Sequence, residues 1–346
     1  MSSLVHPLFD GPLDIVGDIH GEIDALRSLL VALGYAADGR HPAGRRLVFL
    51  GDLCDRGPDS PAVIECVRGL VEADRAQCVL GNHELNLLRH DLKHGNAWCL
   101  DPDHPEPEFG PCVAATPASR AAWHAFFLTL PLALERPDLR VTHAAWHPPA
   151  IELLRATTGS TLEAFDVHEH ALLAELESTG LERAAAAEKQ QYARELVDPT
   201  ARVPLLRNLG MLDEHRQMRN PVRVTTSGPE RVAREPFWAN GKWRMCDRVR
   251  WWDEYADPVP VIVGHYWRKA RAGDGPDLSG GKPDLFGGSP HDAWLGRDRK
   301  VFCVDYSVGG RYLERDQPAF TTRLAAVRWP EQQLVFDDGA TRAMLR

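Results

Sequence analysis

Three short motifs in the first part of the chain carry side chains that could bind metal ions or phosphate. They are GDIHG at residues 17–21, GDLCDRG at 51–57 and GNHE at 81–84, and each follows an apolar run. Aspartate, histidine and asparagine offer the oxygen and imidazole ligands that suit first-row divalent metals. Two single histidines follow later apolar runs, in VTHAAW and VGHYW. The candidate residues are Asp18, His20, Asp52, Asp55, Arg56, Asn82, His83, His143 and His265.

None of these motifs is decisive alone, because a Gly-Asp turn, a helix N-cap or a histidine after a buried strand is common in any fold. Their order and spacing are more specific. Asp18 and Asp52 lie 34 positions apart, and Asp52 and Asn82 lie 30 apart, about one strand-helix unit each. Asp52 stands between the other two sets, which makes it the best candidate for a carboxylate that bridges two ions. Two adjacent ions would clamp a phosphate and acidify a shared water molecule.

The segments around these motifs predict the elements that position them. Three times a short apolar strand runs into a polar loop and then into a segment with helical spacing of apolar residues. We expect helices at 22–35, with Gly34 as a stop signal, and at 60–73, with Ser60 as N-cap. Successive strand-helix units predict an α/β fold in which helices pack on a sheet. Ligand sites in such sheets lie at the carboxyl ends of the strands, where the motifs fall.

The rest of the chain predicts a single domain, 1–346, with a helical insertion or cap at about 151–255. Residues 182–197 are rich in Ala and Glu, which favours helix. We expect loops at 101–112 and at 273–290, where Gly and Pro are frequent. Four tryptophans, at 238, 243, 251 and 252, allow two interpretations. They could form an aromatic wall for a base or peptide, or they could pack the insertion against the core.

Composition excludes several classes of protein. The chain has 346 residues, a net charge of −9 and a pI near 5.9, with scattered Lys and Arg, so we expect no nucleic-acid partner. No apolar run is long enough to cross a membrane, and the N-terminus has no signal-peptide pattern. An odd count of seven cysteines without regular spacing indicates reduced thiols and a cytoplasmic location. The oligomeric state cannot be read from these features.

The three motifs with the two later histidines resemble the calcineurin-like metallophosphoesterases. The similarity is greatest to the phosphoprotein-phosphatase branch, which includes bacterial Ser/Thr phosphatases and symmetrical dinucleoside-tetraphosphate hydrolases. The resemblance implies an α/β fold with a β-sandwich of mixed sheets flanked by helices. It also implies two divalent metal ions at the strand ends, with manganese expected and iron, zinc or magnesium as alternatives.

The resemblance further implies a role for each residue. Asp18 and His20 would hold the first metal and Asp52 would bridge. Asn82, His143 and His265 would hold the second. His83 would act as general acid, oriented by Asp55, and Arg56 would bind the phosphate oxygens.

A second phosphate-binding arginine would lie between His143 and His265. Arg219 and Arg223 are available there, and we favour Arg223 because it lies in a strand-like run, although a surface arginine is an equal alternative. The function implied is a metal-dependent phosphoric ester hydrolase that uses a metal-activated hydroxide. We expect a protein Ser/Thr or Tyr phosphatase. The alternatives are a dinucleoside-polyphosphate hydrolase acting on substrates such as diadenosine tetraphosphate, and a non-enzymatic phosphate-binding regulator.

Overall fold

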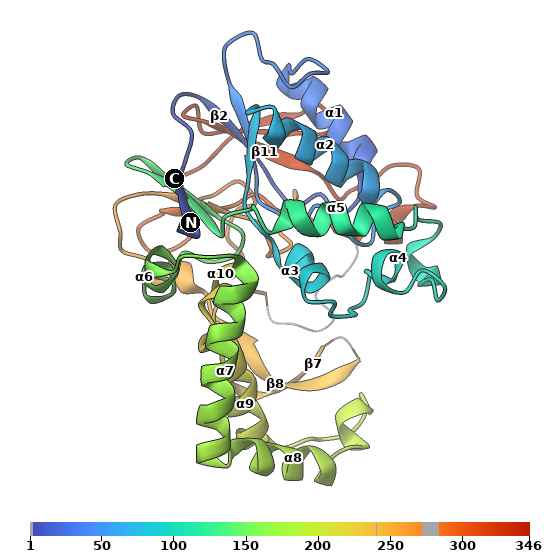
Figure 1. Cartoon of the computed structure of the whole chain (residues 1–346), viewed down its shortest axis with the longest axis vertical. Coiled ribbons are helices and arrows are strands. Elements are labelled where there is room, and N and C mark those ends of the chain that lie inside the picture. The colour runs from blue at the N-terminus through green and yellow to red at the C-terminus, as the bar shows by residue number, and fades with distance from the viewer. Residues whose placement is uncertain (1–2, 240, 272–283) are drawn as a thin grey trace.

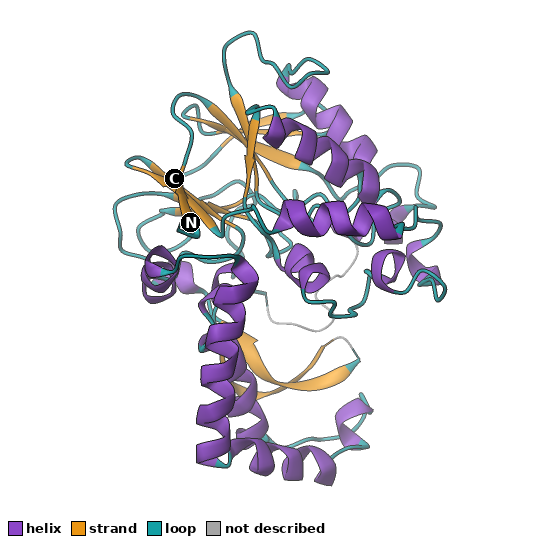
Figure 2. Cartoon of the chain, viewed as in Figure 1, coloured by secondary structure: helices purple, strands orange, loops and turns teal. Residues whose placement is uncertain are grey.

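The computed structural model describes residues 3–239, 241–271 and 284–346. In this part of the chain, two mixed sheets pack face to face and helices cover the outside (Figure 1, Figure 2). The α/β sandwich predicted from the sequence is therefore confirmed. The loop predicted at 273–290 lies outside the described residues as far as residue 283.

The first sheet carries the three motifs. Its strand order is β13-β12-β11-β2-β3-β4, in which β2, β3 and β4 run parallel and β11 to β13 run antiparallel. The strands are β2 (Leu13–Val16), β3 (Arg46–Phe49), β4 (Ala76–Cys78), β11 (Ala325–Trp329), β12 (Gln333–Phe336) and β13 (Thr341–Ala343). Because β2, β3 and β4 are parallel neighbours, the loops that follow them meet at one edge of the sheet.

The second sheet carries the two later histidines. Its order is β1-β5-β6-β9-β10, and β6, β9 and β10 run parallel to one another. The strands are β1 (Val5–Pro7), β5 (Ala133–Arg136), β6 (Leu139–Thr142), β9 (Val261–Val263) and β10 (Val301–Cys303). His143 follows β6 directly, and His265 follows β9 after Gly264, so both lie at the carboxyl ends of their strands.

Alternation along the strands separates two apolar layers. Ile15 and Val48 of the first sheet pack with Val141 and Ile262 of the second, between the sheets. Their neighbours in sequence, such as Val16, face the helices instead. Successive side chains of a strand point to opposite faces of its sheet, so apolar residues at every position bury both faces. A shift of one residue would exchange the two faces, which fixes the register.

Helices α1 (Ile23–Leu33) and α2 (Ser60–Glu72) pack against the first sheet, close to the predicted ranges. Gly34 ends α1 in the left-handed region, at φ 92°, as its stop signal predicts. The predicted N-cap of α2 was wrong by one residue. Asp59 caps the helix by accepting from the Ala62 N–H, while the Ser60 hydroxyl accepts from the Asp55 N–H.

Shorter helices lie beside the motif edge and on the second sheet. They are α3 (Asn82–Leu88), α4 (Ala97–Leu100), η1 (Pro107–Phe109), α5 (Pro117–Phe127), α6 (Pro148–Ala156), η3 (Trp251–Asp253) and η4 (Val308–Glu314). The segment predicted as a loop at 101–112 contains η1 and is otherwise irregular.

Residues 161–248 form an arm that projects from the sandwich (Figure 1). It contains α7 (Thr161–Thr179), α8 (Leu181–Gln191), η2 (Glu195–Val197), α9 (Arg207–Met218), α10 (Pro221–Ser227), β7 (Glu230–Ala239) and β8 (Lys242–Arg248). The sequence predicted a helical insertion. The arm also contains strands, since the antiparallel pair β7-β8 packs against α9. It has a small apolar core of its own, which includes Leu172, Leu176 and Leu212.

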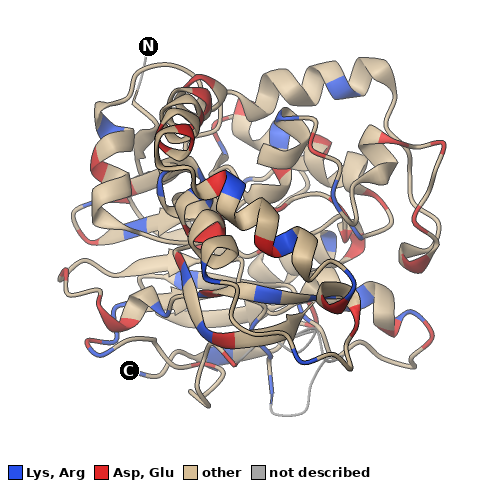
Figure 3. Cartoon of the chain, turned by 90° about the horizontal axis from the view of Figure 1, so that it is seen from below, with Lys and Arg blue, Asp and Glu red and all other residues tan. Residues whose placement is uncertain are grey.

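Within the described residues, no helix is both long and apolar enough to span a membrane. Basic and acidic residues are interspersed along the ribbon in the view of Figure 3, in keeping with the scattered charges of the sequence.

Candidate metal centre

The side chains predicted for the site gather where the strand-end loops of both sheets meet. Asp52 lies at the middle of this cluster. Its Oδ2 atom lies 3.3 Å from Nε2 of His143, 3.7 Å from Nε2 of His20 and 3.8 Å from Nε2 of His83. All four side chains are buried. Histidines from three separate segments thus face one carboxylate.

Possible ligand atoms divide into two groups that share this carboxylate. His20, Asp52 and His83 form one group, and Asp52, His143 and His265 form the other, each with its ligand atoms within 4.8 Å of one another. Such sharing is what a carboxylate between two cations requires.

Asn82 and Asp18 extend the two groups. Asn82 Oδ1 lies 3.2 Å from Nε2 of His143. Asp18 accepts the His265 N–H through Oδ2 at 2.9 Å. The structure therefore brings together all six residues predicted as metal ligands: Asp18, His20, Asp52, Asn82, His143 and His265.

Hydrogen bonds orient two of the imidazole rings. His20 donates from Nδ1 to the Cys54 carbonyl at 3.0 Å, and His143 donates from Nδ1 to the Leu50 carbonyl at 2.6 Å. Each bond turns Nε2 of its ring toward the centre, where Nε2 of His20 faces Arg56 and Nε2 of His143 faces Asp52. Among the described residues, the buried atoms Asp18 Oδ1 and His265 Nε2 have no hydrogen-bond partner. Since buried polar atoms are normally paired, these two fit a bound cation.

The electrostatics of the cluster point the same way. Burial, and then the charges of Asp305 and Asp52, raise the pKa of Asp18 well above its usual range. Burial alone would also raise the pKa of Asp52, but His143 and His83 hold it well below that range. Closely packed, desolvated carboxylates are costly unless positive charge neutralises them. Divalent cations would supply that charge, so the residues present fit the metal ions that the sequence implies.

His83, Asp55 and Arg56 adjoin the metal ligands. His83 donates from Nδ1 to Asp55 Oδ2 at 2.5 Å, which leaves Nε2 as the ring atom facing the centre. The Arg56 guanidinium donates to Nε2 of His20 at 2.8 Å and to Nε2 of His83 at 3.1 Å. The arrangement places an oriented imidazole and a fixed positive charge on the same side of the cluster.

Glycines allow the motif loops to approach one another closely. A Cβ atom at residue 81 would lie 2.3 Å from Asp52 Oδ1, and one at residue 264 would lie 2.0 Å from Asp18 Oδ1. Both distances are far shorter than contact distance. The glycines that precede Asn82 and His265 in GNHE and VGHYW therefore leave room for the aspartates of the other motifs.

Sequence reasoning missed several residues that support the site. Glu84 is fully buried and accepts from the backbone N–H groups of Asp52, Leu53 and Gly81, at 2.8–3.0 Å. Its position in GNHE could have indicated this role. Trp98 donates from its indole to Asp55 Oδ1 at 2.7 Å, and no motif signals it.

Two further residues, Asp305 and Trp267, lie beside the proposed ligands. Asp305, which follows β10, accepts from the N–H of Trp267 at 2.7 Å and raises the pKa of Asp18 through its charge. Trp267, two positions after His265, is partly exposed; its ring centroid lies 4.7 Å from the Arg56 guanidinium and 5.9 Å from the His20 ring.

The strand predicted around Arg223 was wrong. Arg223 lies on α10, where Asn220 caps the helix and Pro221 occupies its first turn. Its guanidinium pairs with Glu169 at 3.2 Å and lies over the Phe165 ring. Its role in substrate binding stays a prediction. Arg248, at the end of β8, was overlooked; after burial, its charge is the largest influence that lowers the pKa of His265.

The tryptophans of the 238–252 segment mainly serve packing. Trp252 is buried, stacks on Phe286 and packs edge-to-face on Tyr266. Trp251 packs on Tyr255 and donates to the Tyr266 hydroxyl. Trp243 donates to the carbonyl of Asp198 within the arm. Trp251 and Trp252 therefore pack in the main core, whereas the contact of Trp243 lies within the arm.

A two-sheet α/β sandwich with paired metal-donor groups at its strand ends is the architecture of a metallophosphoesterase. The sequence profile of the calcineurin-like phosphoesterase family matches residues 11–134, which include the three motifs. The part of the chain that carries the three motifs is therefore that of a calcineurin-like phosphoesterase.

Curated relatives match less than a quarter of the chain. The bis(5'-nucleosyl)-tetraphosphatase PrpE (asymmetrical) of Geobacillus sp. (strain WCH70) is 48% identical over 83 residues, 23% of this chain and 34% of the relative. The symmetrical bis(5'-nucleosyl)-tetraphosphatase of Ralstonia nicotianae is 43% identical over 77 residues, 22% of this chain and 24% of the relative. The chain thus matches about a third or less of the length of these relatives. A solved cold-active protein-tyrosine phosphatase of a Shewanella species covers 98% of this chain, and 82% of its own chain is matched, with 15% identity and a TM-score of 0.47.

Proposed function

We propose that this protein is a dimetal-dependent phosphohydrolase whose substrates are dinucleoside polyphosphates. One observation carries the first half of the proposal: two groups of metal-donor atoms share the Asp52 carboxylate, beside an oriented histidine and an arginine. Metal, proton donor and phosphate-binding charge are the parts that in-line hydrolysis of a phosphate needs.

In this proposal Asp18, His20 and Asp52 would hold one ion, and Asp52, Asn82, His143 and His265 would hold the other. The ions, manganese in the first place, would supply positive charge to the phosphate and lower the pKa of the attacking water molecule.

Arg56 binds and orients the phosphate. Its guanidinium now donates to the neutral imidazole nitrogens of His20 and His83. Phosphate oxygens are stronger acceptors and match the planar fork of arginine, so we expect Arg56 to turn to them when substrate binds. Arg248, whose guanidinium lies 5.6 Å from the centroid of the Tyr266 ring and whose charge lowers the pKa of His265, is a second arginine near the site.

His83 protonates the leaving group. A water molecule that has lost one proton to solvent bonds to phosphorus through its oxygen as the bond from phosphorus to the leaving oxygen breaks. The leaving oxygen takes a proton from Nε2 of His83, which is protonated once Arg56 has turned to the phosphate. Asp55 holds the ring through Nδ1 and stabilises its protonated form, and Trp98 holds Asp55. This chain of buried hydrogen bonds orients the acid before substrate arrives.

The substrate class rests on the named relatives and on Trp267. Both relatives are bis(5'-nucleosyl)-tetraphosphatases, although they match this chain only in part. Trp267 is partly exposed beside Arg56, so a base attached to a bound phosphate could stack on its ring. A phosphoprotein substrate, the first expectation from the sequence, is the alternative.

A phosphate-binding regulator without activity would need the ligands but neither the acid nor its partners. The hydrogen-bonded set of His83, Asp55 and Trp98 has a clear use only in proton transfer. We further propose one domain with the arm as an insertion. The seven free thiols fit the reducing cytoplasm in which we place the reaction.

The test compares two substrates side by side on metal-stripped protein reloaded with Mn²⁺. One is diadenosine tetraphosphate and the other is a mixture of phosphoserine and phosphotyrosine peptides. The proposal expects kcat/KM for the dinucleotide to be higher by about 100-fold, or about 2.7 kcal/mol of transition-state discrimination. A preference of that size for the peptides would establish the protein phosphatase instead. Hydrolysis of neither substrate by protein with two bound ions would refute both.

A further inference from the structure

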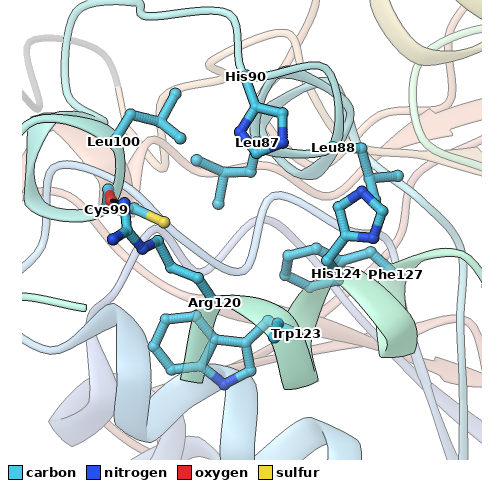
Figure 4. A pocket seen from close by; sticks show the side chains of 10 residues that line it. Leu87, Leu88, His90, Cys99, Leu100, Arg120, Trp123, His124 and Phe127 are labelled. Atoms are coloured by element: carbon cyan, nitrogen blue, oxygen red, sulfur yellow. Dashed lines mark hydrogen bonds between the residues drawn. The ribbon is translucent and has the colours of Figure 1, made fainter. Parts of the chain in front are cut away.

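A cavity of about 290 Å³ lies outside the metal centre, between α3, α4 and α5. Buried side chains line its interior, among them Leu87, Leu88 and Phe127, and Figure 4 shows them facing a common space. The catalytic candidate His83 lies on α3 too, but it does not line this cavity. Nothing in the proposed reaction uses this space.

The interior of the cavity is chemically inert. Besides aliphatic and aromatic groups it exposes the Cys99 thiol, whose pKa burial raises to about 12, so the thiol stays protonated. The indole N–H of Trp123 is already bonded to Glu65 at 2.7 Å. The walls therefore offer apolar surface and ring faces to an occupant. The volume is at the lower end of the range for small-molecule sites.

The mouth of the cavity differs from its interior. It carries Arg120, His90 and His124, which are more exposed than the interior residues, and none of the lining residues is acidic. Arg120 donates to the Cys99 carbonyl at 3.2 Å. Across the described part of the chain, no carboxylate lies within ion-pair distance of Arg120, His90 or His124, and the two imidazole rings stack. An unneutralised guanidinium at the edge of an apolar cavity favours an anionic group on the occupant.

We propose that this cavity is a binding site for a small apolar molecule, aromatic in its body, that carries one anionic group. The rings would enter between Leu87, Leu88 and Phe127, and the anion would pair with Arg120 at the mouth. The site is separate from the metal centre and does not depend on the function proposed for it.

A pair of fluorescent probes tests both halves of this proposal. 8-Anilinonaphthalene-1-sulfonate is an anion, and N-phenyl-1-naphthylamine has the same rings without the charge. The probes are titrated into the metal-loaded full chain and into three variants. A121W fills the cavity from an exposed lining position, A122W adds the same group on α5 outside the lining, and R120Q removes the charge.

The proposal expects one sulfonate probe per chain, with affinity at least tenfold weaker in A121W and unchanged in A122W. R120Q should weaken the sulfonate by about tenfold and leave the neutral probe unaffected. Unchanged sulfonate binding in A121W would show that the probe does not bind in this cavity. Equal effects of R120Q on both probes would show that Arg120 does not pair with an anionic group. Displacement of the sulfonate by inorganic phosphate would assign the probe to the metal centre and also overturn the proposal. Hydrolysis of p-nitrophenyl phosphate at the unsubstituted rate verifies that each variant is folded.

Discussion

Replacing His83 with alanine should slow hydrolysis of an alkyl phosphate far more than hydrolysis of p-nitrophenyl phosphate. The imidazole is buried and held through Nδ1 by Asp55, so Nε2 is the atom available to protonate a leaving oxygen. An alkoxide leaves poorly without a proton, whereas nitrophenolate is a stable anion and needs little help. The two substrates therefore separate proton donation from every other function of the site.

The structure sets the size of the effect. Loss of a positioned general acid costs about 10²–10⁴ in rate, or about 2.7–5.4 kcal/mol of barrier. We expect kcat for the alkyl phosphate to fall within that range and kcat for p-nitrophenyl phosphate to fall by about tenfold or less. Asp55 keeps the indole donor of Trp98 in the variant, and the six proposed metal ligands are untouched. Metal content should therefore stay at about two ions per chain.

The assay measures kcat for both substrates together with metal content by mass spectrometry. H94A is the matched control, since His94 is an exposed histidine that also pairs with a carboxylate, that of Glu108. It should behave as the unsubstituted protein. An equal loss with both substrates, at full metal content, would show that His83 is not the proton donor. Unchanged activity on the alkyl phosphate would remove it from the reaction.

Three further changes give distinct results. Asp52→Asn should lose metal and activity together, because its carboxylate is shared by both donor groups; an active variant with two bound ions, by metal analysis, would exclude bridging. Trp98→Phe removes the donor to buried Asp55 and should cost about 1–3 kcal/mol of unfolding free energy and about tenfold in kcat for the alkyl phosphate. W123F, which removes an indole bond to Glu65 rather than to Asp55, should leave that kcat unchanged in the same denaturation and rate assays. Trp267→Ala should raise KM for diadenosine tetraphosphate by about tenfold, corresponding to the loss of one stacked base, without changing KM for p-nitrophenyl phosphate. Equal changes for both substrates would contradict stacking.

The sequence allowed the first half of the site to be predicted because its geometry is local. Each of the motifs GDIHG, GDLCDRG and GNHE follows a strand, and the three strands are parallel neighbours. Parallel neighbours place the residues that follow them at one edge whatever the rest of the fold does. His143 and His265, which come from the second sheet, were candidates only as single histidines after apolar runs. Nothing in the spacing of those two histidines could show which sheet faces which.

Other residues of the site could not be predicted because only tertiary packing brings them there. Trp98 reaches Asp55 from a short helix without a motif, and Arg248 approaches His265 from the end of a hairpin in the arm. Arg223 was favoured for a strand-like run of β-branched residues. Asn220 and Pro221 are helix-start signals, and these local signals determined the structure. β propensity is a weak guide when a capping signal competes with it.

Backbone conformation adds a constraint that the sequence does not display. His20, Asp52, Asp55, Arg56 and His265 all adopt positive φ, between 48° and 75°, although none of them is glycine. Each such residue costs about 1 kcal/mol or more relative to its preferred conformation. The surroundings must therefore hold them. The Glu84 carboxylate accepts three backbone N–H groups of the motif loops, and the Ser60 hydroxyl accepts another. The backbone conformation preferred by these residue types thus differs from the one observed at the residues that would hold metal and phosphate. A fold retains such unfavourable conformations where binding requires them.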